Sequence, residues 1–257
     1  GAVVLWNPNE KNILYRTDDW GATWTTATGI SAQKSLPTAD PVNPDVFYAF
    51  GGQVYKSTDK GITWATQSLD TNLIRNVIDI HFLSADTGFI SGRNLNNQLS
   101  ESVILKTTDG GTNWTKVFSD TVLGGYIWKI QFINKQFAFG AVQNQYSKDS
   151  VYMLRSTDGG NSWAIRYIDT APQASSGIGL TQACGFINPA KGWVGGYYKG
   201  IYETSDSGKT WTYLNFGNYF NRIFLLDSNH VYAGGTEPYY YGKSGNTIIN
   251  PDVTQHP

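Results

Sequence analysis

Five aspartates recur along the chain with similar residues around them, and they are the first candidates for chemistry. Each stands in a segment of the form Ser/Thr-x-Asp-x-Gly-x-Thr/Asn/Ser-Trp, at intervals of 40, 50, 49 and 48 residues. The aspartates are Asp19, Asp59, Asp109, Asp158 and Asp206. The tryptophans that end the segments are Trp24, Trp64, Trp114, Trp163 and Trp211. Since carboxylates can act as general acids or bases, the pattern must be tested for catalysis as well as for folding.

The spacing within each segment is typical of a tight turn. An Asp side chain can accept hydrogen bonds from backbone N–H groups of its own turn, and the Gly two positions later can adopt a positive φ. The Ser or Thr can add a further bond, and the Trp can pack back over the turn and bury a large apolar area. Because folding a hairpin explains every part, the pattern predicts a structural role for these aspartates.

Outside these segments, Asp79 is the candidate for a catalytic residue. It lies in Val77–His81, which is typical of an inner strand, where an acid could face a central channel; a structural, buried Asp is the alternative. The three histidines show no metal-ligand spacing, and there is no nucleophile elbow or phosphate loop. Cys184 is the only cysteine, which excludes an intrachain disulfide and a cysteine-based zinc site. We therefore expect no metal and no cofactor; a calcium ion bound by backbone carbonyls in the central channel is the alternative.

Strands must position these turns, and the residues before each turn indicate which strands. An apolar strand, a polar turn and an aromatic-rich strand ending in Gly recur, as in residues 81–92 and 185–196. A third strand leads into the Asp segment, and its Trp begins a fourth. Four short strands in about 48 residues match the size of a propeller blade. The sequence therefore predicts an all-β fold, a β-propeller of four-stranded antiparallel blades.

Counting the units predicts six blades in a single domain, or seven if the chain is a fragment of a longer protein. The expected blades are about 1–30, 31–70, 71–120, 121–170, 171–218 and 219–257. The last has no Asp segment, and the first has no obvious strand before Ala2. We expect the two ends to share a blade, which would pair exposed strand edges, with Asn246–Asn250 as one candidate for the closing strand.

Charge and hydropathy narrow the classes of partner. The net charge is −1, and no basic run of the kind that binds nucleic acid is present. The longest apolar runs are far shorter than the ~18 residues that indicate a membrane span. We expect neither nucleic-acid binding nor membrane insertion.

The repeated segments resemble the Asp-box, or BNR, repeats of sialidases, family 74 xyloglucanases and sortilin-type receptor propellers. Residues 1–66 are similar to xyloglucanase blades, chiefly in ADPVNPDVFYAF and GGQVYKSTDKGITW. Residues 77–216 are more similar to photosystem-assembly-factor propellers and secreted bacterial repeats, as the stretch Phe82–Gly92 illustrates. The resemblance implies a secreted, periplasmic or cell-surface protein. It implies little about the activity, because propellers host many functions.

Two functions follow as expectations. The first is a non-catalytic binding or assembly module for a glycan or another protein. The second is a glycoside hydrolase, or part of one, as the xyloglucanase resemblance implies, although neither catalytic Asp of that family maps onto this chain by motif. A sialidase resemblance implies an early Arg-Ile-Pro motif, but Asn221-Arg222-Ile223-Phe224 lacks the proline and falls in the last blade.

The face opposite the Asp segments is the expected binding face, since its loops vary most. They are rich in aromatic and amide side chains, which suit sugars and protein contacts alike. The candidates from these loops are Arg93, Asn96, Asn97, Tyr146, Tyr198 and Tyr240.

Overall fold

The computed structural model consists of strands and turns, which confirms the predicted all-β class. It describes residues 2–7, 10–30, 36–39, 43, 45–50, 53–96, 99–121, 124–144, 151–169, 181–197, 200–241 and 248–249. Within these ranges there is no helix long and apolar enough to cross a membrane. The chain divides into two compact units, Gly1–Thr121 and Val122–Pro257, which are described in turn.

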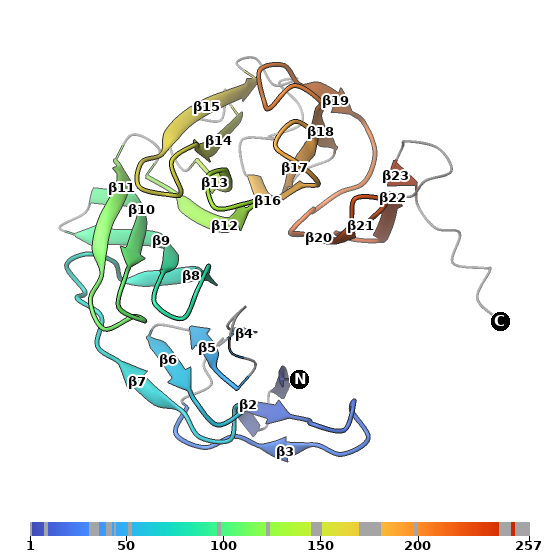
Figure 1. Ribbon diagram of the computed structural model, residues 1–257. Coiled ribbons are helices and arrows are strands. Elements are labelled where there is room, and N and C mark those ends of the chain that lie inside the picture. Colours follow the sequence, from blue (N-terminus) through green and yellow to red (C-terminus); the bar gives the residue numbers. More distant parts are fainter. Residues whose placement is uncertain are drawn as a thin grey trace. The chain divides into compact units, whose positions relative to one another are not determined.

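The described part of the first unit forms three antiparallel sheets, each joined up and down in chain order (Figure 1). Sheet 1 contains β1 (Ala2–Asn7), β2 (Glu10–Arg16) and β3 (Thr25–Thr26). Sheet 2 contains β4 (Leu36–Ala39), β5 (Phe47–Phe50), β6 (Val54–Ser57) and β7 (Ala65–Gln67). Sheet 3 contains β8 (Asn76–Phe82), β9 (Gly88–Asn96), β10 (Leu99–Thr107) and β11 (Thr115–Asp120).

The second unit repeats the same design in its described residues. Sheet 4 contains β12 (Tyr126–Phe132), β13 (Ala138–Gln143), β14 (Val151–Ser156) and β15 (Ala164–Asp169). Sheet 5 contains β16 (Thr181–Phe186), β17 (Gly192–Gly196), β18 (Ile201–Thr204) and β19 (Thr212–Leu214). Sheet 6 contains β20 (Arg222–Asp227), β21 (His230–Gly234), β22 (Pro238–Tyr241) and β23 (Ile248–Ile249). The predicted four-stranded antiparallel unit is thus confirmed in sheets 2 to 6.

The ends of the series differ from its middle. In sheets 2 to 5 the Asp segment joins the third strand to the fourth, whereas in sheet 1 it joins β2 to β3. The strands described for sheet 1 therefore correspond to the second, third and fourth strands of the other sheets. Within Asn246–Asn250, β23 pairs with β22 as the fourth strand of sheet 6. The shared closing blade and the number of blades remain predictions.

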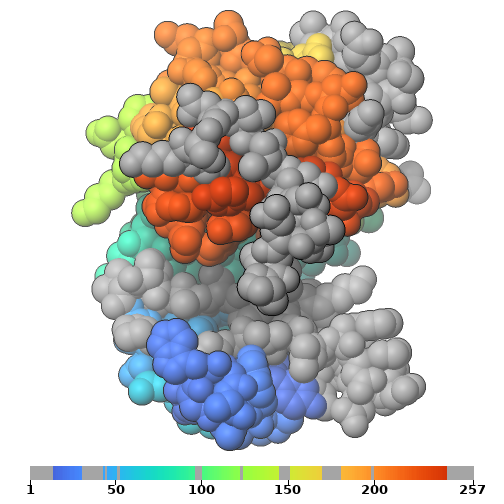
Figure 2. All heavy atoms as spheres, turned by 90° about the vertical axis from the view of Figure 1, so that its right-hand side faces the viewer, coloured from blue at the N-terminus to red at the C-terminus, as the bar shows by residue number. Residues whose placement is uncertain are grey.

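Stacked aromatic rings join sheet 2 to sheet 3 and sheet 4 to sheet 5. Tyr48 of β5 stacks on Phe82 of β8, with ring centroids 3.9 Å apart. Phe139 of β13 stacks on Phe186 of β16 at 3.6 Å. In the second unit the first strands also adjoin, since β12 contacts β16 and β16 contacts β20. Figure 2 shows the orange atoms of sheet 5 beside the red atoms of sheet 6, in agreement with that contact.

Candidate functional site

The five Asp segments, called boxes from here on, form the same hydrogen-bonded turn. In the fourth box, Asp158 Oδ1 accepts the backbone N–H of Ser162 at 3.0 Å, and Oδ2 accepts the Ser162 hydroxyl at 2.6 Å. Ser156 Oγ donates to Asp158 Oδ1 at 2.8 Å and accepts the Gly160 N–H at 2.9 Å. These bonds favour the charged carboxylate, with the Ser162 side chain the largest contributor, and they lower the pKa of Asp158 to about 2.

The other boxes repeat this arrangement with small variations. Donated side-chain and backbone hydrogen bonds lower the pKa of the carboxyl group to about 2 in Asp59, Asp109 and Asp206. The Asp19 carboxyl accepts the Thr23 hydroxyl and the Thr23 N–H, and its pKa is also lowered. In four boxes the Trp indole N–H donates to the carbonyl of the box Gly, as Trp163 does to Gly160 at 3.2 Å. The box end of sheets 1 to 5 therefore uses its box carboxylates and hydroxyls within the turn.

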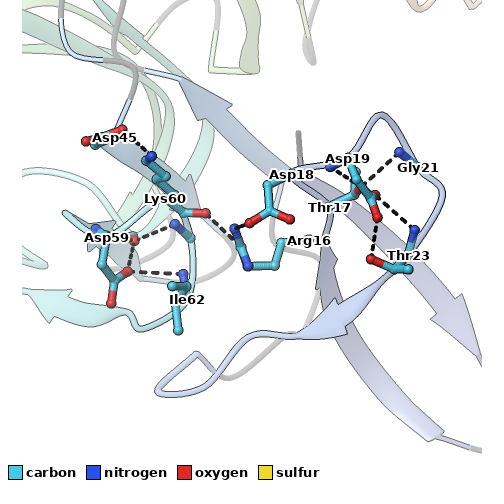
Figure 3. A network of polar contacts seen from close by, with 12 residues as sticks. Arg16, Thr17, Asp18, Asp19, Gly21, Thr23, Asp45, Asp59, Lys60 and Ile62 are labelled. Carbon is cyan, nitrogen blue, oxygen red and sulfur yellow. Dashed lines mark hydrogen bonds and ion pairs between the residues drawn. The ribbon is translucent and has the colours of Figure 1, made fainter.

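A cation in front of each of the first two boxes connects one sheet to the next, and Figure 3 shows the first of these contacts, from Arg16 to Lys60. Arg16 Nε donates to the Lys60 carbonyl at 3.0 Å, and the Arg16 guanidinium also pairs with Asp18 at 2.8 Å. At the equivalent place in sheet 2, Lys56 Nζ donates to the Gly110 carbonyl at 3.2 Å. Sheet 5 has Glu203 at this position, and no box follows it in sheet 6. The carbonyl of the fourth box residue thus accepts a hydrogen bond from the preceding sheet at both of these interfaces.

The opposite end of the sheets is the loop end, where second strands run into third strands and one sheet leads to the next. In sheet 4, Trp128 Nε1 donates to Gln143 Oε1 at 2.6 Å, and the Trp128 ring lies 5.5 Å from the Tyr126 ring. Trp128 is the extra residue of a β-bulge in β12, since the register with β13 shifts between Ile127 and Lys129. Bulges often redirect a side chain, and the first strands of sheets 3 and 5 contain bulges at matching points.

A second aromatic group lies where sheet 5 leads into sheet 6. The rings of Tyr197 and Tyr219 meet edge to face, with centroids 4.7 Å apart and an interplanar angle of 85°. Both side chains are substantially exposed. The candidate loop-end site in the described residues therefore consists of aromatic and amide groups.

The structure places the predicted binding residues unevenly. Arg93 and Asn96 are not in a loop, because β9 and β10 extend through this region as a long hairpin in which Arg93 pairs with Ser102 and Asn96 with Leu99. Tyr240 is not in a loop either. It lies in β22, where its ring is 5.1 Å from Tyr232, so its predicted loop position was wrong. Three of the predicted residues lie outside the described residues, and they are Asn97, Tyr146 and Tyr198.

Three loop-end residues were not among the six chosen candidates: Trp128, Tyr197 and Tyr219. Tyr197 and Tyr219 do lie in loops that the sequence assigns to the expected binding face. A signal existed for Tyr219, which stands in the glycine-containing connection Asn215–Phe220 between two predicted blades. No sequence signal distinguishes Trp128 from an ordinary inner-strand residue, because its distinguishing feature is the bulge.

Asp79 is buried in β8, with 5% of its surface exposed, and its backbone is in register with Ser91 of β9. Across the part of the chain that the structure describes, no group of three or more His, Cys, Asp or Glu side chains could hold a metal ion.

The chain is similar in sequence to xyloglucanases and to an assembly lipoprotein. It is 29% identical over 155 residues to a probable oligoxyloglucan-reducing end-specific xyloglucanase of Neosartorya fischeri, which covers 58% of this chain and 18% of that protein. The corresponding enzyme of Emericella nidulans is 29% identical over 258 residues, 94% of this chain and 24% of the relative. The photosystem II assembly lipoprotein Ycf48 of Synechococcus is 32% identical over 120 residues, 46% of this chain and 32% of the relative. The chain thus spans a third or less of the length of these proteins.

Solved structures identify the fold. The GH74 xyloglucanase of Xanthomonas campestris superposes with a TM-score of 0.72 at 15% identity, over 95% of this chain and 43% of that chain. An ancestral GH74 enzyme gives 0.64 at 16% identity, over 84% and 30%. The four-stranded sheets are therefore propeller blades. The model of the Sortilin-Vps10 family, described as sortilin, neurotensin receptor 3, matches residues 12–152. Since this match covers more than half of the 257 residues, the chain belongs to the Sortilin-Vps10 family of Asp-box propellers.

Proposed function

We propose that this propeller is a non-catalytic binding or assembly module that binds a glycan or a protein through its loop end. The observation that carries the proposal is the contrast between the two ends of the sheets. The box carboxylates each accept several bonds from their own turn, as Asp158 does. The exposed rings of the box end, Trp20 and Trp24, belong to the first box turn itself, whereas the loop end presents exposed rings outside any repeated turn, such as Tyr197 and Tyr219. Binding sites are commonly carried by loops on rigid scaffolds.

The relatives support both kinds of ligand. Two are named as xyloglucanases that act on oligoxyloglucan reducing ends, and one as an assembly lipoprotein. The proposal includes a place of action outside the cytoplasm, which is favoured because the Synechococcus relative is named a lipoprotein. Cell fractionation with an antibody against the chain tests this part, and a purely cytoplasmic signal would contradict it.

A glycoside hydrolase, or part of one, is the second candidate, because of the xyloglucanase relatives. Hydrolysis needs two carboxyl groups about 5–5.5 Å or ~6.5–9.5 Å apart around an accessible sugar. Asp79 is the sequence-based candidate for one of them, but it is buried in β8. This burial favours the binding module over the hydrolase.

The test combines a glycan array with a hydrolysis assay on soluble β-glucans, both on the purified 257-residue chain. We expect saturable binding without release of reducing ends. Turnover that disappears in Asp79→Asn, while the variant stays folded, would establish the hydrolase instead. Absence of binding on the array would direct the proposal to protein ligands, to be tested by crosslinking in the native host.

A further inference from the structure

Tyr219 adopts a backbone conformation that is unfavourable for its residue type. Its φ is +57°, in the left-handed region that glycine occupies freely and bulky side chains rarely do. In the described residues the other non-glycine positions with positive φ are Trp20, Lys60 and Ser207, and all three occupy the fourth place of a box turn. Tyr219 is outside any box, so the repeated turn does not explain it. Such strain persists where the surroundings impose it, and it concentrates at functional sites.

Hydrogen bonds and packing on both sides of Tyr219 hold its backbone in this left-handed conformation. The Gly200 N–H donates to the Gly217 carbonyl at 3.0 Å, and the Thr236 N–H donates to the Asn218 carbonyl at 3.1 Å. On the other side, Phe220 is fully buried, and its ring lies 5.1 Å from that of Tyr239. The connection is therefore held on both sides of Tyr219, while the Tyr219 side chain itself is 45% exposed.

The side chain that Tyr219 meets is also exposed. Tyr197, 43% exposed, follows β17 and contacts the Tyr219 ring edge to face. Two rings at a right angle form a corner with two apolar walls and two phenol hydroxyls. The edge-to-face contact between the two rings restricts both side chains, which reduces the side-chain freedom that is lost when a ligand binds.

The two short segments that carry the rings, residues 192–197 and 216–221, contain no Asp, Glu, Lys or Arg. The charged residues nearest to the two rings in sequence are Lys199 and Arg222, and Asn218 supplies an amide in the second segment. Anionic ligands such as phosphates and carboxylates are usually held by Arg or Lys, which these segments lack; Lys199 is outside the described residues. Flat apolar walls with hydroxyl and amide groups suit a ring that has apolar C–H faces and many hydroxyls.

We propose that Tyr197 and Tyr219 form a stacking platform for a neutral pyranose residue of an oligosaccharide, and that the left-handed Tyr219 is retained for this binding. The inference rests on the proposed binding function and specifies one ligand class and one place for it. It predicts that Tyr219 lowers stability in exchange for affinity, a combination that a purely structural residue does not show.

The experiment measures binding of cellohexaose and maltohexaose to the intact chain by calorimetry, with hexagalacturonate and an octaproline peptide as comparison probes. For Tyr219→Gly and Tyr197→Ala we expect the dissociation constant for a neutral hexasaccharide to rise at least about fivefold, as for an anchor residue. Tyr219→Gly should keep or raise the thermal unfolding midpoint, because glycine adopts this φ without strain. Tyr197→Phe should retain most of the affinity, since it keeps the ring.

The matched control is Tyr167→Ala, which removes a 61% exposed tyrosine from β15 and should leave binding within about twofold of the parent. Equal affinity of the parent and Tyr219→Gly for the neutral sugars would overturn the platform but leave the binding module standing. Octaproline binding that depends on the two tyrosines, without sugar binding, would overturn the sugar assignment. Binding of none of the four probes would overturn the platform. Cleavage of a hexasaccharide would instead contradict the non-catalytic function.

Discussion

Sheets 4 and 6 carry an aromatic residue at the same place in their second strands, but the ring is buried in sheet 4 and exposed in sheet 6. Phe139 of sheet 4 is fully buried and stacks on Phe186 of sheet 5. Tyr232 of sheet 6 is 46% exposed, and its ring neighbour is Tyr240 of its own sheet. Sheet 4 carries a box, and sheet 6 has none. The repeat therefore determines where a ring is placed, whereas the adjacent sheet determines whether that ring stabilises the fold.

The largest effect should come from removing these rings. We expect Phe139→Ala to lower the free energy of unfolding by about 3–5 kcal/mol, as for a large side chain in a packed core. Tyr232→Ala should cost less than about 1 kcal/mol, because half of that ring is already in water. Urea unfolding monitored by tryptophan fluorescence gives both values. Similar losses for the two variants would show that the Tyr232 face is covered in solution.

Removing a box carboxylate should have a smaller effect. Asp158→Ala deletes the acceptor of the Ser162 N–H and of two hydroxyls. We expect a loss of about 1–2 kcal/mol, towards the lower end because the turn is open to solvent. Asp227→Ala, which alters the exposed turn between β20 and β21, should lower the urea midpoint less. An unchanged midpoint for Asp158→Ala would contradict the structural role of the boxes.

The same carboxylates predict how stability depends on pH. Their pKa in the folded chain is about 2, below the ordinary value of 3.8. A lowered folded-state pKa stabilises the fold above the unfolded-state value, and this contribution is lost as the pH falls towards 2. We expect the urea midpoint to fall between pH 5 and pH 3, and to fall less steeply in Asp158→Asn. An equally steep fall in that variant would assign the pH dependence to other groups.

The smallest expected effect on stability comes from substitutions at the fourth residue of two boxes. The fourth box residue is Gly159 in one and Ser207 in the next, with φ of +71° and +69°. A left-handed conformation costs a non-glycine residue about 1–2 kcal/mol. Replacing that residue by glycine removes this cost, but the greater flexibility of glycine in the unfolded chain offsets part of the gain. Ser207→Gly should therefore stabilise the chain by up to about 1 kcal/mol in thermal unfolding. Gly159→Ser should destabilise it, because its Cβ would lie 2.7 Å from the Lys135 carbonyl.

Features set by neighbours in sequence could be predicted, and features set by packing could not. The bonds of Asp158 reach residues at most four positions away, so the box turn follows from the sequence. The sequence predicts loops for Arg93 and Tyr240, but Arg93 pairs with Ser102 in a long hairpin and Tyr240 lies in β22, where the first position of the strand accommodates Pro238. The Tyr197–Tyr219 contact joins residues 22 positions apart, and it depends on how sheet 5 leads into sheet 6.

The bond from Arg16 to the Lys60 carbonyl gives the blade series a direction that matters for gene duplication. Each donor is encoded in one blade and its acceptor in the next, as with Lys56 and Gly110. A boxed blade copied behind sheets 1 or 2 would find a matching donor. Copied behind sheet 5, it would bring its carbonyl towards Glu203, which already accepts the Trp193 indole N–H and pairs with Lys191. Tandem duplication, in nature or by design, should therefore succeed more readily at the start of this series than behind its fifth blade.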